Sequence, residues 1–144
     1  MSSNVARPHV PAFHPFHPFH ALLLGGAVTL FLGALLGDVA YARTYEIQWN
    51  NFASWLIVGG LVVSAVALAC SIFGLLPSRR TRQSVLHAGL LLATWLAGLL
   101  NALMHARDAW ASMPGGLVLS VIVVVLACLA TWLGCWATRI GATP

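Results

Sequence analysis

Four long apolar runs constrain this chain more than any other feature. They cover approximately residues 20–41, 52–76, 84–106 and 116–138. Each is long enough to cross the hydrocarbon core of a bilayer, which takes roughly 20 residues. Only 7% of the residues are charged, too few to cover the surface of a soluble domain. Because lipid leaves only helices and closed barrels as spanning structures, and a barrel needs short alternating segments, the sequence predicts an all-α integral membrane bundle.

We therefore expect one domain of four transmembrane helices over residues 20–144, preceded by an interfacial segment over residues 1–19. Helix-capping and turn residues mark the expected helix ends. They are Pro18 at the first turn of the first span, Pro77 after the second, Ser84 as N-cap of the third, and the turn MPGG at 113–116 before the fourth. A cleaved signal peptide ending at AYA, residues 40–42, is the alternative for the first span. We disfavour it because its leader would be long, with one arginine and four prolines.

Arginine sets the expected orientation, since the chain has no lysine. The side of the membrane that holds both termini and the second loop carries Arg7, Arg79, Arg80, Arg82 and Arg139, and the other side carries Arg43 and Arg107. This excess predicts that both termini are cytoplasmic. The net charge of +4 has the same origin, so we infer no nucleic-acid partner from it.

Small residues recur at helical spacing and predict close helix packing in lipid. They are Gly26, Thr29, Gly33 and Gly37 in the first span, Gly60, Ser64, Ala67, Ser71 and Gly74 in the second, and Ser120, Ala127, Thr131, Gly134 and Thr138 in the fourth. We interpret them as packing seams and not as sites. Cys70, Cys128 and Cys135 form no CxxC pair, and we expect them to be small buried apolar side chains.

Four ionisable residues define two expected levels in the bundle. Asp38 follows His20 by 18 residues, and His105 follows His87 by 18 residues. Eighteen residues make five whole helical turns, so each pair lies on one helix face, roughly 27 Å apart along the axis. Because the first and third spans run in the same direction, we expect His20 beside His87 at the cytoplasmic level and Asp38 beside His105 at the outer level.

The first and third spans also resemble each other. HALLLGGAVTLFLGALLGD at 20–38 and HAGLLLATWLAGLLNALMH at 87–105 share their length, their HA start and their ionisable ends. This likeness suggests a parallel internal repeat of two helices. Between its histidines, the third span carries Thr94, Gly98 and Asn101 on one face, and we expect that face to look into the bundle.

Two imidazoles at equal depth on two helices are the ligand set of a b-type haem. We therefore predict that His20 and His87 bind one haem. Asp38, Asn101 and His105 are then placed for proton exchange with a quinone. The alternatives are hydrated interfacial histidines and, for Asp38, a simple ion pair with His105 or a nearby arginine.

The segment FHPFHPFH at 13–20 leads into the first span. Its prolines favour polyproline II, in which His14, His17 and His20 would project from one side about 9 Å apart. This spacing is too long for all three to hold one metal in an extended chain, although a bend after Pro18 would bring two together. The segment is either an interfacial anchor or a source of ligands for haem or a divalent metal.

These features leave three functions open. The first is a redox subunit that passes electrons between a partner protein and a quinone. The second is a non-catalytic membrane anchor or assembly partner, which includes a homo-oligomer. The third is divalent-metal binding through His14 and His17. The absence of GxSxG, Walker, CxxC and HExxH motifs indicates no hydrolase or nucleotide site, so we expect no independent catalytic activity.

Several short motifs resemble a bacterial four-helix membrane family labelled domain of unknown function 2231. They are HPFHP at 14–18, Asp38 late in the first span, His87 early in the third, and WLG at 132–134 followed by Arg139. The resemblance implies an inner-membrane protein, sometimes a module beside redox domains. Leu23 and Leu24 replace the Phe-Pro common in the family, and Ile140 replaces a histidine. This last departure removes one candidate haem ligand.

Overall fold

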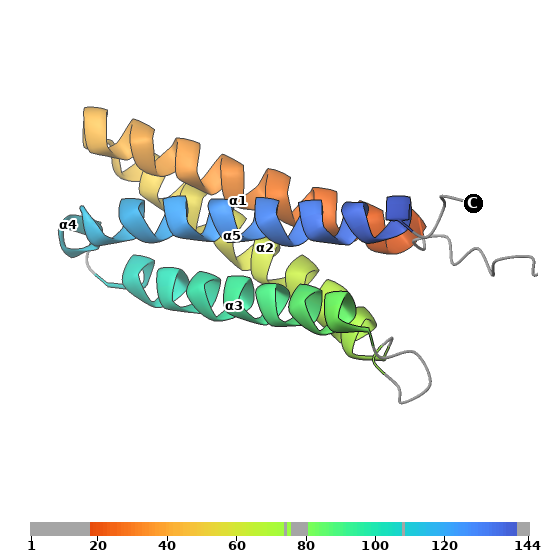
Figure 1. The fold of residues 1–144 in the computed structure, drawn as a ribbon. Helices are drawn as coiled ribbons and strands as arrows, with labels where there is room; N and C mark the ends of the chain where they lie inside the picture. Colours follow the sequence, from red (N-terminus) through yellow and green to blue (C-terminus); the bar gives the residue numbers. More distant parts are fainter. Residues whose placement is uncertain (1–17, 74, 76–80, 108, 141–144) are drawn as a thin grey trace, which may run out of the picture.

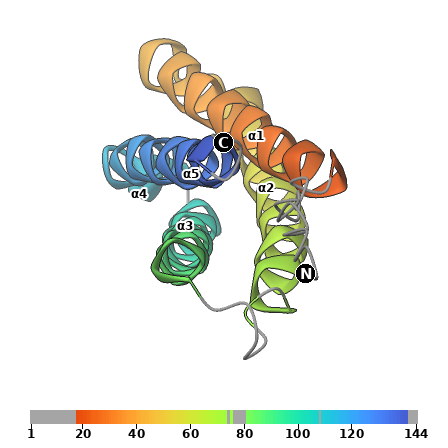
Figure 2. The same cartoon turned by 45° about the vertical axis from the view of Figure 1, so that its right-hand side comes forward.

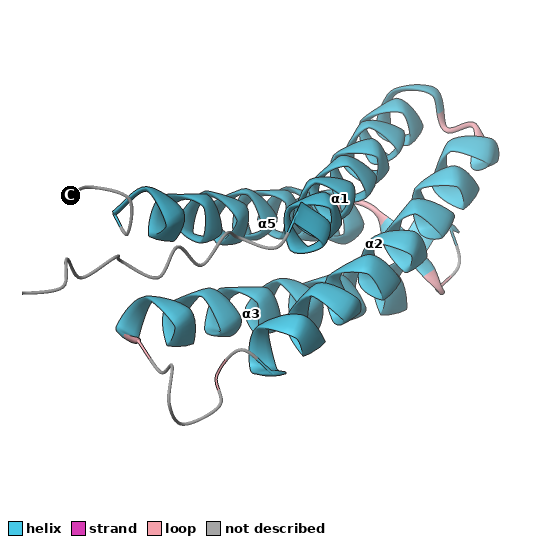
Figure 3. Ribbon diagram, turned by 90° about the vertical axis from the view of Figure 1, so that its right-hand side faces the viewer, coloured by secondary structure: helices cyan, strands magenta, loops and turns pink. Residues whose placement is uncertain are grey.

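Four long helices and one short helix make up the structure, a computed structural model that describes residues 18–73, 75, 81–107 and 109–140. They are α1 (Pro18–Thr44), α2 (Ile47–Phe73), α3 (Arg82–His105), α4 (Ala109–Ser112) and α5 (Gly115–Ile140). The four long helices are each apolar enough to cross a membrane. The described residues contain no strand (Figure 3). The predicted all-α membrane bundle is therefore confirmed.

The helices stand at the corners of a four-helix bundle. α1 packs against α2 and α5, and α3 packs against the same two helices, so α1 and α3 occupy opposite corners (Figure 2). The start of α1 and the end of α5 lie at one end of the bundle, here called the termini end (Figure 1). The α1–α2 turn and α4 lie at the other, the turn end. α1 and α3 therefore run in the same direction, as the alternating spans predicted.

The observed helix ends correct two expectations. α1 begins at Pro18, as predicted, but the N-cap of α3 is Thr81 and not Ser84. The Thr81 hydroxyl accepts a hydrogen bond from the Ser84 backbone N–H at 3.1 Å, so Ser84 lies inside the first turn. α2 begins at Ile47, ahead of the expected start near residue 52. The helix therefore includes polar residues at the turn end that precede the apolar run. Pro77 lies outside the described residues.

Gly33 and Gly37 bring α1 and α2 into close contact. A Cβ atom on Gly37 would lie 3.2 Å from the Ala53 Cβ and 3.3 Å from the Trp49 carbonyl oxygen, and one on Gly33 would lie 3.0 Å from a methyl of Leu56. These glycines therefore allow the two backbones to approach, as expected for a small-residue seam.

Phe31 fills the middle of the bundle, where it is 1% exposed. A Cβ on Gly60 of α2 would lie 2.6 Å from the Phe31 ring, and one on Gly98 of α3 would lie 3.3 Å from it. Together with Ala27, Val123 and Ala127, the ring forms an apolar layer, here called the Phe31 layer. This layer separates the two ends of the interior.

Buried positions of the first two long helices recur 67 residues later in the last two. The pairs are Leu24/Leu91, Ala27/Thr94, Phe31/Gly98, Ala34/Asn101 and Asp38/His105 in α1 and α3, and Ala53/Ser120, Gly60/Ala127 and Ala67/Gly134 in α2 and α5. Every member of these pairs is buried. A constant offset in both helix pairs is what the predicted parallel repeat requires.

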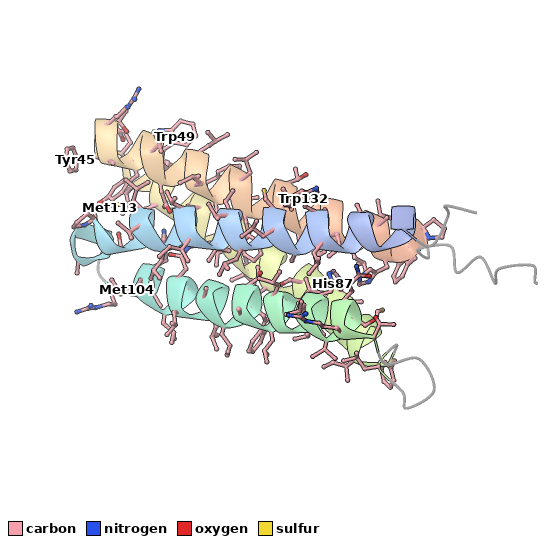
Figure 4. All side chains as sticks on the ribbon, viewed as in Figure 1. Tyr45, Trp49, His87, Met104, Met113 and Trp132 are labelled. Carbon is pink, nitrogen blue, oxygen red and sulfur yellow. The ribbon has the colours of Figure 1, made fainter. Side chains whose placement is uncertain are left out.

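The expectation that the cysteines are buried is wrong. Cys70, Cys128 and Cys135 are all exposed on the outer faces of α2 and α5. In a membrane those faces contact acyl chains, which accommodate a small apolar thiol as well as a core does. Tyr45 and Trp49 lie at the turn end, where aromatic side chains suit the membrane interface (Figure 4).

Candidate functional site

Two polar pairs connect α1 with α3 through the bundle interior. The Nε2 atoms of His20 and His87 lie 3.2 Å apart, and the Nε2 atom of His105 lies 2.8 Å from Oδ1 of Asp38. Each pair joins residues that are 67 positions apart. The structure thus brings together the side chains that the helical spacing placed at common levels, while their roles stay predictions.

The two imidazoles of the His20–His87 pair, here called the histidine pair, meet head to head. Nδ1 of His87 lies 3.0 Å from the Ala130 carbonyl oxygen of α5. Because a carbonyl oxygen only accepts, Nδ1 carries the hydrogen and the neutral ring presents a lone pair at Nε2. His20 then donates its Nε2–H to His87. The ring centroids are 5.5 Å apart, so both Nε2 atoms lie near the line that joins the rings.

Apolar side chains surround the histidine pair at the termini end. Leu24, Ala67, Leu91 and Ala130 form a buried cluster at this level, with three partly buried leucines packed against it. His87 is 9% exposed on α3 (Figure 4). The Ser71 hydroxyl lies 3.5 Å from Nε2 of His20, a long contact. The pair is therefore a polar contact at the level of this apolar cluster.

Asp38, His105, Ser120 and Asn101 form a second polar group, here called the aspartate network. Asp38 is fully buried at 0% exposure. Its Oδ1 faces His105, and its Oδ2 accepts a hydrogen bond of 2.5 Å from the Ser120 hydroxyl of α5. Ser120 in turn accepts one of 2.8 Å from the Asn101 side-chain amide of α3. The network therefore links three of the four long helices near the turn end.

The hydrogen bonds of His105 fix the proton content of this network. Nδ1 lies 3.0 Å from the Asn101 backbone carbonyl oxygen, which only accepts, so Nδ1 is protonated. One further proton then lies between Nε2 of His105 and Oδ1 of Asp38. It makes the pair either an imidazolium with a carboxylate or two neutral groups, and the total charge is zero in both forms. His105 and Asp38 accordingly share one proton in the bundle interior.

The sequence interpretation missed the role of Ser120. It placed Ser120 in a packing seam of the fourth span, whereas the structure gives it hydrogen bonds to both Asp38 and Asn101. The distance of each residue from its helix end could have indicated this contact. Ser120 lies five residues after the start of α5, and Asn101 lies four residues before the end of α3, both at the turn end. Counting from the turns would have put them at one level.

A pocket opens beside the aspartate network at the turn end. Its volume is ≈ 440 Å³, and its lining comprises Ile47, Gln48, Asn50, Asn51, Ser54, His105 and Arg107. Asn50 is mostly buried, at 7% exposure, and its Oδ1 accepts a hydrogen bond of 3.3 Å from the Ser112 hydroxyl. The first two turns of α2 thus provide most of the polar lining, and the sequence analysis had singled out none of the lining residues that come from α2.

The histidine pair and the aspartate network are separated by the Phe31 layer. Thr94 and Gly98 of α3 do face the interior, as predicted. The Thr94 hydroxyl donates to the Leu90 carbonyl of its own helix, however, and Phe31 covers Gly98. In the part of the chain that the structure describes, no hydrogen-bonded chain of side chains crosses this layer. The two polar groups are therefore spatially separate.

The predicted metal site at the N-terminal histidines is not tested. His14 and His17 lie outside the described residues, and His20 is directed to His87. Among the residues with described positions, no group of three His, Cys, Asp or Glu side chains could hold a metal ion.

Comparisons with known proteins place the chain in a membrane family. A family model described as "Predicted membrane protein (DUF2231)" matches residues 16–142, which includes every described residue of the histidine pair, the aspartate network and the pocket. No curated protein and no solved structure matches the chain.

Proposed function

This chain belongs to the DUF2231 family of predicted membrane proteins, and from that premise we propose that it is a membrane redox subunit whose His20 and His87 bind one b-type haem. The observation that carries the proposal is the head-to-head contact of the two Nε2 atoms. Two imidazoles that face each other from separate helices have the arrangement of axial ligands on opposite sides of one iron. Bound haem would supply one-electron transfer to a partner protein.

The donor set of the histidine pair fits this ligand. His87 holds its Nδ1–H on the Ala130 carbonyl oxygen, and histidine ligands commonly have this second hydrogen bond, which fixes the ring and its tautomer. His20 reaches the same point from α1, a helix that does not pack closely against α3. The 3.2 Å contact would have to lengthen, and the leucines around the pair would have to move aside.

The predicted quinone receives less support than the haem. Both ring nitrogens of His105 are bonded within the protein, and Asp38 is fully buried. A quinone could take the shared proton only after the His105 ring turned toward the pocket. The quinone role of Asp38, Asn101 and His105 therefore stays a prediction, and the proposal is limited to haem-linked electron transfer.

The proposal places the protein in the bacterial inner membrane with the histidine pair near the cytoplasm. The arginine distribution supports this orientation, although Arg7, Arg79 and Arg80 lie outside the described residues. A reporter fused after Pro144 tests it, since alkaline phosphatase would be inactive there and green fluorescent protein would fluoresce. The opposite pattern would reverse the orientation.

Absorption spectroscopy tests haem binding directly. We expect protein purified from cells supplied with a haem precursor to have a Soret band and, after reduction with dithionite, a sharp alpha band. His20→Ala and His87→Ala should each abolish the low-spin spectrum, because each removes one axial ligand. The matched control is the double variant His14→Ala/His17→Ala, which removes two histidines of the N-terminal segment and should retain the spectrum.

A colourless preparation would overturn the haem proposal, provided that the protein elutes as a single folded species. So would a spectrum that His87→Ala leaves unchanged. Loss of the spectrum in the His14→Ala/His17→Ala control would indicate that the haem ligands lie in the N-terminal segment and not in the histidine pair.

A non-catalytic anchor is the second candidate function, and one specific observation favours it. The facing nitrogens of the histidine pair already bond to each other, and His87 also bonds Ala130. Such a pair can act solely as an interhelical clamp, which is a common use of polar side chains in membranes. Under this candidate, folded and colourless protein would copurify with a partner subunit or with further copies of itself.

A further inference from the structure

The pocket at the turn end has the chemistry of an anion site. We propose that it binds a phosphate-type oxyanion, presented either by a lipid head group or by a soluble phosphate compound. The proposal is independent of haem binding, because the pocket lies beyond the Phe31 layer from the histidine pair. Its volume of ≈ 440 Å³ falls within the range of small-ligand pockets.

Asn50 supplies the first reason. This side chain is 7% exposed and lines the pocket, and its Oδ1 is occupied by the Ser112 hydroxyl. No hydrogen bond from its Nδ2 group to another described residue is found, so this donor is available to a group that enters the pocket. An amide N–H in a pocket lining donates to an acceptor oxygen of a ligand. The ligand should therefore present an acceptor oxygen at this point.

Arg107 supplies the second reason, because it gives the pocket a positive charge. Its guanidinium contacts the Met104 sulfur at 3.9 Å. The one salt bridge found within the described ranges joins His105 and Asp38, so Arg107 has no carboxylate partner there. A guanidinium binds phosphate and carboxylate oxygens in preference to neutral carbonyls, since the hydrogen bonds are charge-assisted.

The remaining lining agrees with an anion. Among the described residues that line it, none is acidic, and the first turn of α2 contains no acidic residue, with Glu46 directly before it. The positive end of the α2 dipole therefore adds to the charge of Arg107. Gln48, Asn51 and Ser54 contribute amides and a hydroxyl, which can bond the other oxygens of a phosphate group.

Two titrations of detergent-solubilised protein separate the sources of the oxyanion. One adds inorganic phosphate in a phosphate-free nonionic detergent, followed by isothermal titration calorimetry. The other adds phosphatidylglycerol, with an uncharged glycolipid as reference, followed by native mass spectrometry. Saturable binding of phosphate points to a soluble ligand, and retention of phosphatidylglycerol alone points to a lipid head group.

Three variants make the test specific to the pocket. Arg107→Gln removes the positive charge, and Gln48→Glu adds a negative charge on an exposed lining residue without disturbing the core. Each should weaken binding about tenfold, because it alters a charge-assisted contact. The matched control is Arg43→Gln, which removes an arginine at the same end of the bundle but outside the lining, and which should leave the affinity unchanged.

The proposal is overturned by an absence of saturable binding in both titrations. It is equally overturned if Arg43→Gln weakens binding as much as Arg107→Gln, because the effect would then reflect net charge alone. The proposal is also overturned if a neutral benzoquinone binds the pocket with the same affinity before and after Arg107→Gln. The ligand class would then be a neutral quinone and not an oxyanion. None of these results depends on whether the protein is coloured.

Discussion

The histidine pair and the aspartate network use the same geometry with different partners. In each, a histidine of α3 donates its Nδ1–H to a backbone carbonyl and turns Nε2 to the α1 residue 67 positions earlier. In the histidine pair both partners are imidazoles. In the aspartate network one is a carboxylate, and Ser120 adds a further hydrogen bond.

This difference in partners decides which of the two contacts can separate to admit a ligand. Separating two neutral imidazoles leaves no buried charge, so the histidine pair can exchange its contact for a ligand at modest cost. Removing one partner of a buried carboxylate is far more costly, because the carboxylate keeps its charge or must take up a proton in an apolar interior. The aspartate network should therefore stabilise the fold, and the histidine pair should be the adaptable site.

The largest expected effect is on the aspartate network. His105→Ala should lower the free energy of unfolding by about 3–5 kcal/mol, because it leaves Asp38 buried without its proton partner. The double variant Asp38→Leu/His105→Leu should lose less, since it removes both polar groups. SDS titration in mixed micelles measures both values. A double variant that is no more stable than the single one would contradict the charge-based explanation.

Ser120→Ala should have the next largest effect, about 1–2 kcal/mol, because the hydroxyl donates to a carboxylate between helices. Ser64→Ala is the matched control. Ser64 is also fully buried, but among the described residues its hydroxyl bonds only the Leu61 carbonyl of its own helix, so its loss should be about 0.5 kcal/mol or less. Equal losses in the same SDS titration would mean that Ser120 acts through packing alone.

His20→Leu should cost less than either change to the network, about 0.5–1 kcal/mol in haem-free protein. It removes one neutral interhelical hydrogen bond and leaves the His87 ring held by Ala130. The unfolding titration of apoprotein measures this loss. If His20→Leu proved as damaging as His105→Ala, the two sites would not differ as proposed, and the histidine pair would be a structural element of equal weight.

The smallest expected effect is the coupling between the two sites. In a double-mutant cycle of His20→Leu with Ser120→Ala, the two losses should add to within about 0.3–0.5 kcal/mol, because the Phe31 layer separates the sites and they share no partner. The cycle is measured on the same unfolding free energies. A coupling above about 1 kcal/mol would show that the apolar layer transmits a rearrangement between them.

Sequence spacing was sufficient for the fold and for the depth of the polar pairs. The apolar runs gave the helices, and the 18-residue intervals gave the levels, because the rise per residue of a helix is nearly constant. His20, His87, Asp38 and His105 could therefore be assigned to levels without coordinates.

Rotation of each helix about its axis was not predictable in the same way. The polar face of the third span, with Thr94, Gly98 and Asn101, did indicate its rotation, but spans that are apolar on nearly every face have no hydrophobic periodicity that marks an inward side. The cysteines were consequently placed inside although they face outward, and the bonding of Ser120 to Asp38 was missed. The pocket was missed for a different reason, since it depends on α2 starting at Ile47 and on where the α3 helix ends.

The Phe31 ring against Gly98 has a consequence for how the two halves of the chain relate. The two residues occupy equivalent positions of the repeat. The first half provides a large phenyl ring there, and the second half provides a glycine that leaves space for it. Two copies of the first half would bring two phenyl groups into space for one, and two copies of the second would leave a hole. The two helix hairpins are thus complementary in shape at the Phe31 layer.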